Sequence, residues 1–132
     1  MSVPQSQSFN HLTIIGLGLI GGSIARAVKA VGLSTHVTAY DASEAVRDRV
    51  RELGLADTVA ETLEAAVANS DCVILCTPVG TFEGIAQAMA PHLKPGAIVS
   101  DVGSTKGSAI AAVSPHLPEQ CHLVPAHPVA GT

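Results

Sequence analysis

Residues 14–23 read Ile-Ile-Gly-Leu-Gly-Leu-Ile-Gly-Gly-Ser and decide the fold of this chain. An apolar run ends at Gly16 and a helical pattern begins just after Gly18, so the stretch predicts a strand, a glycine turn and a helix. Gly16 would permit the tight turn, Gly18 would let a bound group approach the backbone, and Gly21 would let the helix pack against the strand. In the alternative interpretation, the glycines serve only the packing of the helix on the strand.

An acidic residue stands at the end of the next apolar run. Asp41 follows Gly21 by 20 residues, the spacing at which dinucleotide-binding chains place a carboxylate for the ribose hydroxyls. A carboxylate there would repel a 2′-phosphate, so NAD is favoured over NADP as the cofactor. The phosphates would bind the N–H groups of the first helical turn, at Leu19 and Ile20, where the helix dipole is positive. The spacing therefore predicts an NAD site.

Strand and helix patterns alternate along the whole chain. Apolar runs predict strands over residues 11–15, 36–40, 58–60, 72–76, 97–100 and 123–126. Periodic segments predict helices over residues 19–31, 43–53, 62–68, 82–90 and 104–114. This alternation predicts an α/β fold with right-handed crossovers, a doubly wound parallel sheet of the Rossmann-like type with strand order 3-2-1-4-5-6.

Two finer expectations concern side-chain burial. In the first helix, the inward face is predicted to be formed by Ile20, Ile24, Ala27, Val28 and Val31. Cys72 and Cys76 lie four residues apart in a predicted strand and would share one face of the sheet. That arrangement favours buried thiols over a metal-binding pair, so no metal site is predicted.

Length and composition limit the class of protein. The 132 residues are 47% hydrophobic and 14% charged, which predicts one compact domain over residues 11–132 after a loose tail over residues 1–10. Two explanations account for this apolar composition. The chain could form a parallel sheet that is buried on both faces, and it could present a surface that contacts another domain or subunit. The net charge of −4 and the scarcity of aromatic residues argue against a nucleic-acid partner. With no long apolar segment and no signal-peptide pattern, we expect no membrane partner and a cytoplasmic location.

Ligands of a doubly wound sheet bind beyond the carboxyl ends of its strands, where this sequence has several polar residues. After the last predicted strand comes His127, whose neutral imidazole could accept a proton from a substrate hydroxyl as hydride leaves the adjacent carbon. Ser104 follows the fifth strand at a predicted helix N-terminus, where it could cap the helix or bond to the imidazole or the substrate. Thr77 and Pro78 follow the fourth strand and would shape the nicotinamide side of the site through backbone contacts. Lys106 could meet a substrate carboxylate or remain in solvent.

Five motifs together resemble a known family. They are GLGLIGGS at residues 16–23, Asp41 after the second strand, CTPV at residues 76–79, DVGSTKG at residues 101–107 and HPVAGT at residues 127–132. This combination resembles the prephenate/arogenate (cyclohexadienyl) dehydrogenases of tyrosine biosynthesis. The resemblance implies NAD-dependent oxidative decarboxylation of prephenate or arogenate to 4-hydroxyphenylpyruvate or tyrosine. It also implies that His127 polarises the ring hydroxyl and that Ser104 assists it.

The resemblance extends to the last residue, Thr132. Members of the family continue with the rest of the nucleotide domain and a helical domain that forms a homodimer and completes the substrate pocket. We therefore expect a single truncated domain that is weakly active or inactive alone and belongs to a dimeric enzyme acting on a small molecule. Two alternatives remain: a two-domain dehydrogenase of the β-hydroxyacid type, and a free-standing NAD-binding module without turnover. The sequence does not choose between prephenate and arogenate as the substrate.

Overall fold

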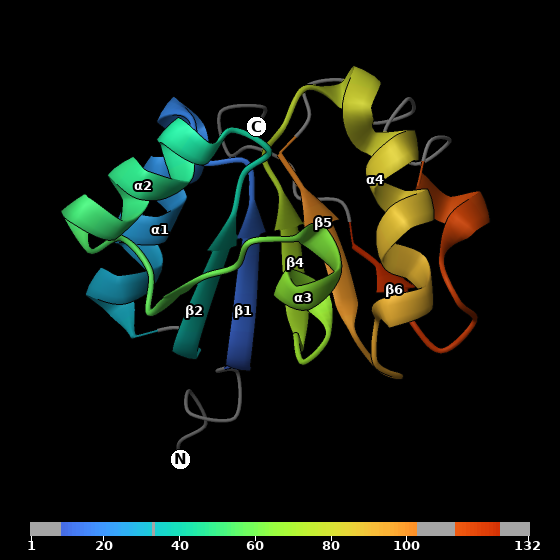
Figure 1. Ribbon diagram of the computed structural model, residues 1–132. Helices are drawn as coiled ribbons and strands as arrows, with labels where there is room; N and C mark the ends of the chain where they lie inside the picture. The colour runs from blue at the N-terminus through green and yellow to red at the C-terminus, as the bar shows by residue number, and fades with distance from the viewer. Residues whose placement is uncertain (1–8, 33, 103–112, 125–132) are drawn as a thin grey trace, which may run out of the picture.

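Six parallel strands form the centre of the molecule (Figure 1). The computed structural model describes residues 9–32, 34–102 and 113–124. The strand order is β3-β2-β1-β4-β5-β6, and every neighbouring pair is parallel, so the predicted doubly wound topology is confirmed. The strands are β1 (Phe9–Ile15), β2 (Ser34–Tyr40), β3 (Thr58–Val59), β4 (Cys72–Leu75), β5 (Ile98–Asp101) and β6 (His122–Leu123).

Helices cover both faces of this sheet. On one face lie α1 (Leu19–Val31) and α2 (Glu44–Leu53), and on the other lie α3 (Leu63–Val67) and α4 (Phe82–Met89) (Figure 1). Short 3₁₀ turns form η2 (Val79–Thr81), η3 (Ala90–His92) and η4 (Ser114–His116). Because the strands are parallel, their carboxyl ends share one edge of the sheet, which is the upper edge in Figure 1.

The helices begin and end at the capping residues in the sequence. The hydroxyls of Ser43 and Thr62 accept backbone N–H groups three residues further on, at 3.3 and 3.1 Å, and so begin α2 and α3. Gly32 ends α1 and Gly54 ends α2, with φ of 67° and 64° in the left-handed region. Local sequence therefore determines where these helices lie along the chain.

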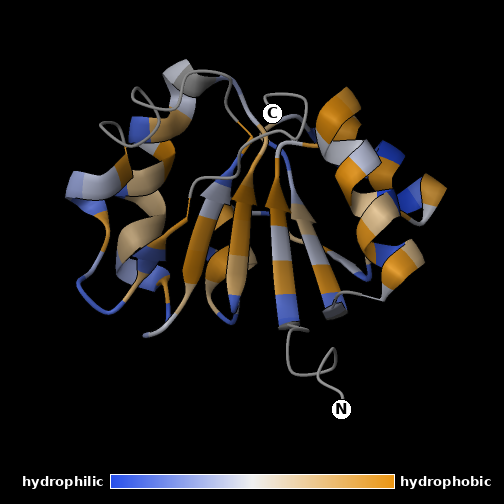
Figure 2. Cartoon of the chain, turned by 180° about the vertical axis from the view of Figure 1, so that it is seen from behind, coloured by the Kyte–Doolittle hydropathy of each residue, from blue (hydrophilic) through white to orange (hydrophobic). Residues whose placement is uncertain are grey.

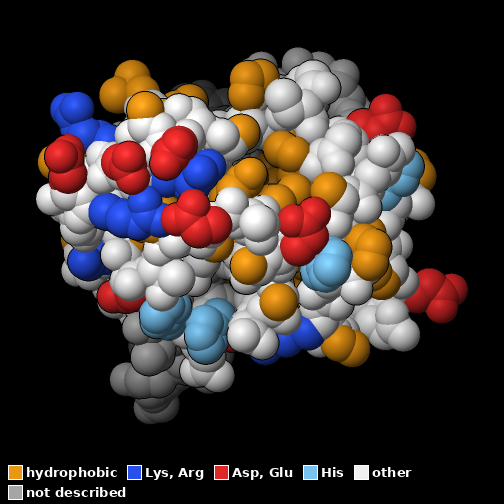
Figure 3. Space-filling model, viewed as in Figure 1, with side chains coloured by type: hydrophobic (Ala, Val, Ile, Leu, Met, Phe, Trp, Pro, Cys, Tyr) orange, Lys and Arg blue, Asp and Glu red, His pale blue; other side chains and the backbone are white. Residues whose placement is uncertain are grey.

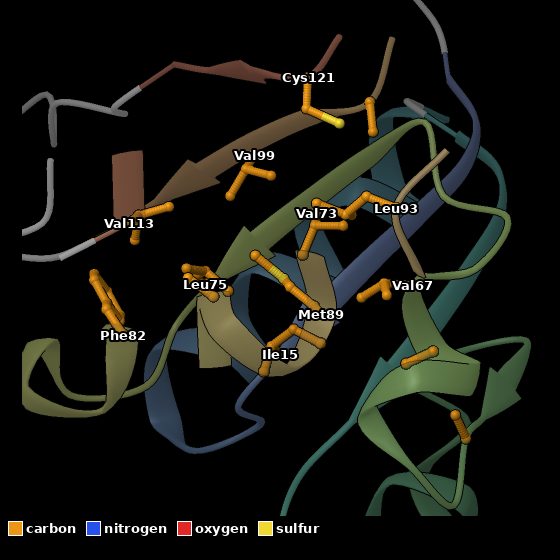
Figure 4. Close-up of a cluster of buried hydrophobic side chains, with 14 residues drawn as sticks. Ile15, Val67, Val73, Leu75, Phe82, Met89, Leu93, Val99, Val113 and Cys121 are labelled. Atoms are coloured by element: carbon orange, nitrogen blue, oxygen red, sulfur yellow. The ribbon is translucent and has the colours of Figure 1, made fainter. Parts of the chain in front are cut away.

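The sheet separates two apolar clusters, and its central strands are largely apolar (Figure 2). Leu12, Ile14 and Val28 belong to the cluster beneath α1 and α2. In the cluster beneath α3 and α4, Phe82 and Met89 of α4 are completely buried. Figure 4 labels members of this second cluster: Ile15, Val67, Val73, Leu75, Phe82, Met89, Leu93, Val99, Val113 and Cys121.

The inward face of α1 agrees only in part with the predicted one: Val28 is buried and the partly buried Ile24 packs against the cluster beneath α1 and α2, as predicted. The helix buries Gly21, Ala25 and Val28, which lie one above another at four- and three-residue intervals. The close fit of Gly21 against the preceding turn sets this face, so the first turn of the helix presents a glycine rather than Ile20 to the sheet. The members of the predicted face that are exposed are Ile20, Ala27 and Val31.

The first strand begins at Phe9, two residues earlier than predicted, so Phe9 and Asn10 belong to the sheet and not to a loose tail. The carboxylate of Asp71, just before β4, explains this extension, because it accepts the N–H groups of Asn10 and His11, each at 2.9 Å. Phe9 pairs with Ser34, and β2 also begins two residues earlier than predicted.

The last strand, β6, begins at His122, one residue earlier than predicted. Parts of several expectations lie outside the described residues: most of the predicted tail (residues 1–8), most of the predicted helix over residues 104–114, and residues 125–126 of the predicted last strand.

Cys72 and Cys76 share one face of the sheet, as predicted, and contact the cluster beneath α1 and α2. Burial raises the pKa of Cys72 to about 11 and the pKa of Cys76 to about 12, and the charges of Asp71 and Asp101 respectively act in the same direction. Both thiols are therefore protonated and unreactive at neutral pH. Among the residues that the structure describes, no three His, Cys, Asp or Glu side chains gather as metal ligands. No helix in these ranges is long and apolar enough to cross a membrane.

Candidate functional site

Close packing in the turn after β1 requires two of its glycines. Gly16 has a φ of 94°, and a Cβ atom on it would lie 2.7 Å from Cγ2 of Thr77. A Cβ atom on Gly21 would lie 1.9 Å from the carbonyl oxygen of Gly16, a distance that no side chain can tolerate. The N–H of Gly16 also donates to the carbonyl of Tyr40 at 2.8 Å, which fixes the turn to the end of β2. Packing therefore requires glycine at both Gly16 and Gly21, as the roles predicted for them in the turn demand.

Gly18 differs, because packing within the described chain does not require it. It is the N-cap of α1 with a φ of −72° and a ψ of −153°, so its φ lies outside the left-handed region that favours glycine. A Cβ atom at this position would meet nothing within 4 Å. Gly18 therefore borders open space at the turn, which is what a glycine that admits a ligand to the backbone requires.

The first turn of α1 is suited to an anion. Gly18 offers no side-chain cap, and the turn contains no acidic residue. Leu19 is 89% exposed and Ile20 is 56% exposed, so this end of the helix is open to solvent. The N–H groups there lie at the positive end of a 13-residue helix, where phosphate groups bind in many proteins.

Asp41 lies directly beside the glycine turn, as the spacing predicts. One oxygen of its carboxylate, Oδ2, accepts the N–H of Leu17 at 2.9 Å, and the other, Oδ1, accepts the N–H of Ser43 at 2.9 Å. The side chain is only partly buried. Each carboxylate oxygen has a second acceptor position, so the group could also accept hydrogen bonds from a pair of hydroxyls.

Thr77 and Pro78 lie in the neighbouring loop, at the carboxyl end of β4. The methyl group of Thr77 faces the Cα atom of Gly16, so this loop and the glycine turn are in contact. The hydroxyl of Thr81 lies 2.7 Å from both the hydroxyl of Thr77 and the carbonyl of Pro78. The backbone N–H of Thr81 donates to the same carbonyl at 2.9 Å. The loop is thus held by its own hydrogen bonds beside the turn.

The structure brings together Gly16, Gly18, Leu19, Ile20, Gly21, Asp41, Thr77 and Pro78 at one edge of the sheet. Asp101, at the end of β5, is buried, and its Cα atom pairs with that of Leu75 in β4. The predicted catalytic residues Ser104 and His127 lie outside the described residues, as does Lys106.

Arg47, to which the sequence analysis assigns no role, also lies against this site. Its Nη1 donates to the backbone carbonyl of Asp41 at 2.8 Å, and its guanidinium carbon lies 5.9 Å from the ring centroid of Tyr40. An arginine in a charged helix is ordinarily solvated, which is why the sequence gives no reason to single it out. Its position, one helical turn after the cap residue Ser43, is the feature of the sequence that could have indicated a contact with the end of β2.

A groove of about 370 Å³ also begins at the glycine turn. It runs between α1 and α2 from Leu17 and Gly18 to Leu53, and Arg26 and Arg49 flank it. Neither Asp41 nor Thr77 lines it. The groove therefore overlaps the predicted site at Gly18 and Leu19 and extends away from its other residues.

Comparison with known proteins relates this geometry to a family. Residues 24–132 match the family model described as "Prephenate dehydrogenase, nucleotide-binding domain". The match begins after the glycine turn, so the turn and the match are separate observations. The chain is 49% identical over 124 residues to the cyclohexadienyl dehydrogenase of Zymomonas mobilis, covering 94% of this chain and 42% of that relative. It is 30% identical over 128 residues to the prephenate dehydrogenase of Bacillus subtilis, covering 96% of this chain and 34% of that relative.

A solved structure shows the same similarity. The prephenate dehydrogenase from Aquifex aeolicus, crystallised in complex with hydroxyphenyl propionate and NAD⁺, matches 96% of this chain with a TM-score of 0.83 and 31% sequence identity. That match covers 44% of the crystallised chain. The chain therefore spans less than half the length of each of these relatives.

Proposed function

The chain belongs to the family of prephenate dehydrogenase nucleotide-binding domains, and from this premise we propose that it is the cofactor-binding and catalytic-histidine part of an NAD-dependent prephenate or arogenate dehydrogenase. The substrate would be oxidatively decarboxylated to 4-hydroxyphenylpyruvate or tyrosine. The complete enzyme would be a homodimer that works in the cytoplasm, with its dimer contacts in a further helical domain.

The observation that supports this proposal best is the arrangement of Gly18 and Asp41. Gly18 leaves the backbone open where packing demands no glycine, and the carboxylate of Asp41 is tied to the N–H of Leu17 next to it. A dinucleotide needs both features, one for its pyrophosphate and one for its adenosine ribose. The residues present thus fit NAD, and the similar Aquifex aeolicus enzyme was crystallised with NAD⁺.

Each proposed contact follows from a described position. The N–H groups at Gly18, Leu19 and Ile20 would hold the pyrophosphate at the positive end of α1. Asp41 would accept hydrogen bonds from the ribose hydroxyls, and its charge would exclude a 2′-phosphate. Gly16 and Gly21 would keep the turn tight, and the backbone of Thr77 and Pro78 would border the nicotinamide half.

When bound, NAD supplies the acceptor for a hydride from the ring carbon that bears the hydroxyl. The neutral imidazole of His127 would accept a hydrogen bond from that hydroxyl as the hydride leaves, and would return any proton it takes as the ring becomes a phenol. Ser104 would bond to the same hydroxyl or to the imidazole. The ring carboxylate departs as CO₂, its bonding electrons completing the aromatic ring, so the chain needs mainly to align these groups.

The experiment that tests the proposal uses the full-length protein. Calorimetric titration with NAD and, separately, NADP should show saturable binding of NAD and much weaker binding of NADP. NADH absorbance should then rise when prephenate or arogenate is added. Binding of neither cofactor would overturn the proposal, and turnover of a β-hydroxyacid without turnover of either cyclohexadienol would assign the protein to the other class of dehydrogenase.

A further inference from the structure

Two arginines of α2, Arg47 and Arg51, form ion pairs, and Arg47 is the less exposed of them. Its side chain is 12% exposed, whereas that of Arg51, one turn further along the same helix, is 42% exposed. Both arginines meet Glu61, Arg47 with Nη2 at 3.6 Å from the carboxylate and Arg51 in a direct ion pair. Figure 3 shows that basic and acidic side chains are interleaved on the surface over α2. The two arginines differ in one respect: Arg47 reaches the end of β2.

Arg47 binds a backbone carbonyl that follows the last paired residues of β2. Pairing of β2 with β3 ends at Ala39 and Val59, and the carbonyl of Ala39 accepts the N–H of Ala60 at 3.0 Å. The next carbonyl, at Tyr40, accepts the N–H of Gly16. The carbonyl of Asp41 therefore comes after both ladders, and Nη1 of Arg47 donates to it at 2.8 Å.

Two contacts hold the guanidinium at this carbonyl. Its carbon lies 5.9 Å from the ring centroid of Tyr40, within the range of a cation–π interaction, and its Nη2 lies 3.6 Å from the carboxylate of Glu61. The carboxylate oxygens of Asp41 meanwhile accept the N–H groups of Leu17 and Ser43. Arg47 thus fixes the peptide of Asp41 through its backbone, and the negative charge of the side chain remains directed to the turn.

We propose that Arg47 is a positioning residue for cofactor recognition, which acts by holding the Asp41 peptide so that its carboxylate faces the adenosine ribose of NAD. The inference rests on the proposed function, because it requires Asp41 to be the residue that meets the ribose. It adds a residue that neither touches the reacting atoms nor appears in the glycine fingerprint. Arg47 acts through Asp41, and it contributes to affinity for NAD only while the Asp41 carboxylate is present.

A double-mutant cycle in the full-length protein tests this coupling. NAD affinity is measured by calorimetry for the wild type, Arg47→Ala, Asp41→Ala and the double variant. We expect Arg47→Ala to weaken NAD binding about tenfold, the loss typical of a hydrogen bond from a charged group. In the Asp41→Ala background the same substitution should change NAD affinity less than about twofold, because the group being positioned is gone.

Arg51→Ala is the matched control, because it removes an arginine that pairs with Glu61 from the same helix face without touching Asp41. Its NAD affinity should remain within about twofold of the wild type, and the melting temperature of every variant is recorded to confirm folding. Arg47→Lys keeps the positive charge on a single donor nitrogen, so NAD affinity should fall only about threefold, again only when Asp41 is present. This variant repeats the cycle if Arg47→Ala does not fold.

Three outcomes would overturn the inference: unchanged NAD affinity in Arg47→Ala, an equal loss in Arg51→Ala, or an equal loss from the Arg47 substitution with and without Asp41. Each of these leaves the proposed function standing, because the wild-type protein still binds NAD. A wild-type protein that binds no NAD would instead overturn the proposed function, and the inference with it.

Discussion

The backbone N–H of Leu17 donates to the carboxylate of Asp41 at 2.9 Å, so the glycine turn and the end of β2 are joined across 24 residues of sequence. The bond explains why the acidic residue and the turn occur together in a dinucleotide-binding chain. The same carboxylate that would meet the ribose also fixes the turn that would meet the pyrophosphate. The two halves of the proposed site are therefore not independent, and substitutions at either should affect both.

Replacing Asp41 tests whether its carboxylate discriminates between the riboses of NAD and NADP. In the full-length protein, Asp41→Asn removes the charge and keeps an oxygen that can accept the Leu17 N–H. We expect the preference for NAD over NADP to narrow by about tenfold, because the repulsion of a 2′-phosphate is lost. The ratio of the two dissociation constants, measured by calorimetry, checks this. An unchanged ratio would show that another residue discriminates between the cofactors.

Gly21→Ala tests the packing of the turn. Its Cβ atom would lie 1.9 Å from the Gly16 carbonyl, so α1 must move away from β1. We expect a loss of about 2–3 kcal/mol in the free energy of unfolding, measured by denaturant titration, together with weaker NAD binding. Gly22→Ala is the control, since its Cβ atom would meet only the end of the Arg26 side chain, at 4.0 Å. That change should stabilise the helix by up to about 1 kcal/mol. Equal stability of the two variants would contradict the account.

His127→Asn tests the proposed catalytic role. In the complete enzyme, kcat should fall by about 10²–10⁴-fold, because no neutral imidazole is left to polarise the ring hydroxyl. NAD affinity should change less than about twofold, since the proposed cofactor contacts lie elsewhere. Steady-state kinetics and calorimetry measure the two effects separately. Turnover close to that of the wild type would remove His127 from the mechanism.

Asp71 should make the stability of the protein depend on pH in acid. The ammonium group of Lys94, 2.5 Å from its carboxylate, lowers the pKa of Asp71 below the ordinary value of 3.8, and the N–H groups of His11 and Asn10 act in the same direction while burial opposes them. Because folding lowers this pKa, the unfolded chain binds the proton more tightly, and stability is lost as the pH falls below about 4. Asp71→Asn should reduce stability by about 1 kcal/mol at pH 7 and flatten this acid dependence, which denaturant titrations between pH 7 and pH 2 would reveal. An identical pH profile for the variant would contradict the assignment.

Local signals made much of the fold predictable. Ser43, Thr62, Gly32 and Gly54 each determine a helix boundary through bonds to nearby residues or through their own backbone conformation, and the sequence shows them directly. The strand order follows from alternation and the handedness of crossovers, which need no knowledge of side-chain contacts. Asp41 could be found because its partner is the glycine turn at a regular spacing.

Contacts between distant segments account for the features that the sequence did not show. β1 starts early because Asp71, 60 residues after His11, accepts its N–H, and no pattern near Phe9 reveals that partner. Hydrophobic periodicity predicts that Ile20 and Val31 face inward, yet both are exposed, because this pattern does not show the contact between Gly21 and the turn. The role of Arg47 likewise depends on a contact that the sequence does not show. The carbonyl of Asp41 is available to Arg47 because the pairing of β2 with β3 ends at Ala39 and Val59.

The short length of β3 affects whether strands of separate molecules can pair at this edge of the sheet. Its pairing with β2 extends over Thr58 and Val59 alone, at one edge of the described sheet, and exposed Asp57 and Glu61 flank it. A longer bare edge would offer a row of free N–H and C=O groups on which the strand of another molecule could grow. Here that row is short, and charged side chains border it, because Glu61 forms ion pairs with Arg47 and Arg51. This edge of a chain that is 47% hydrophobic therefore disfavours edge-to-edge aggregation.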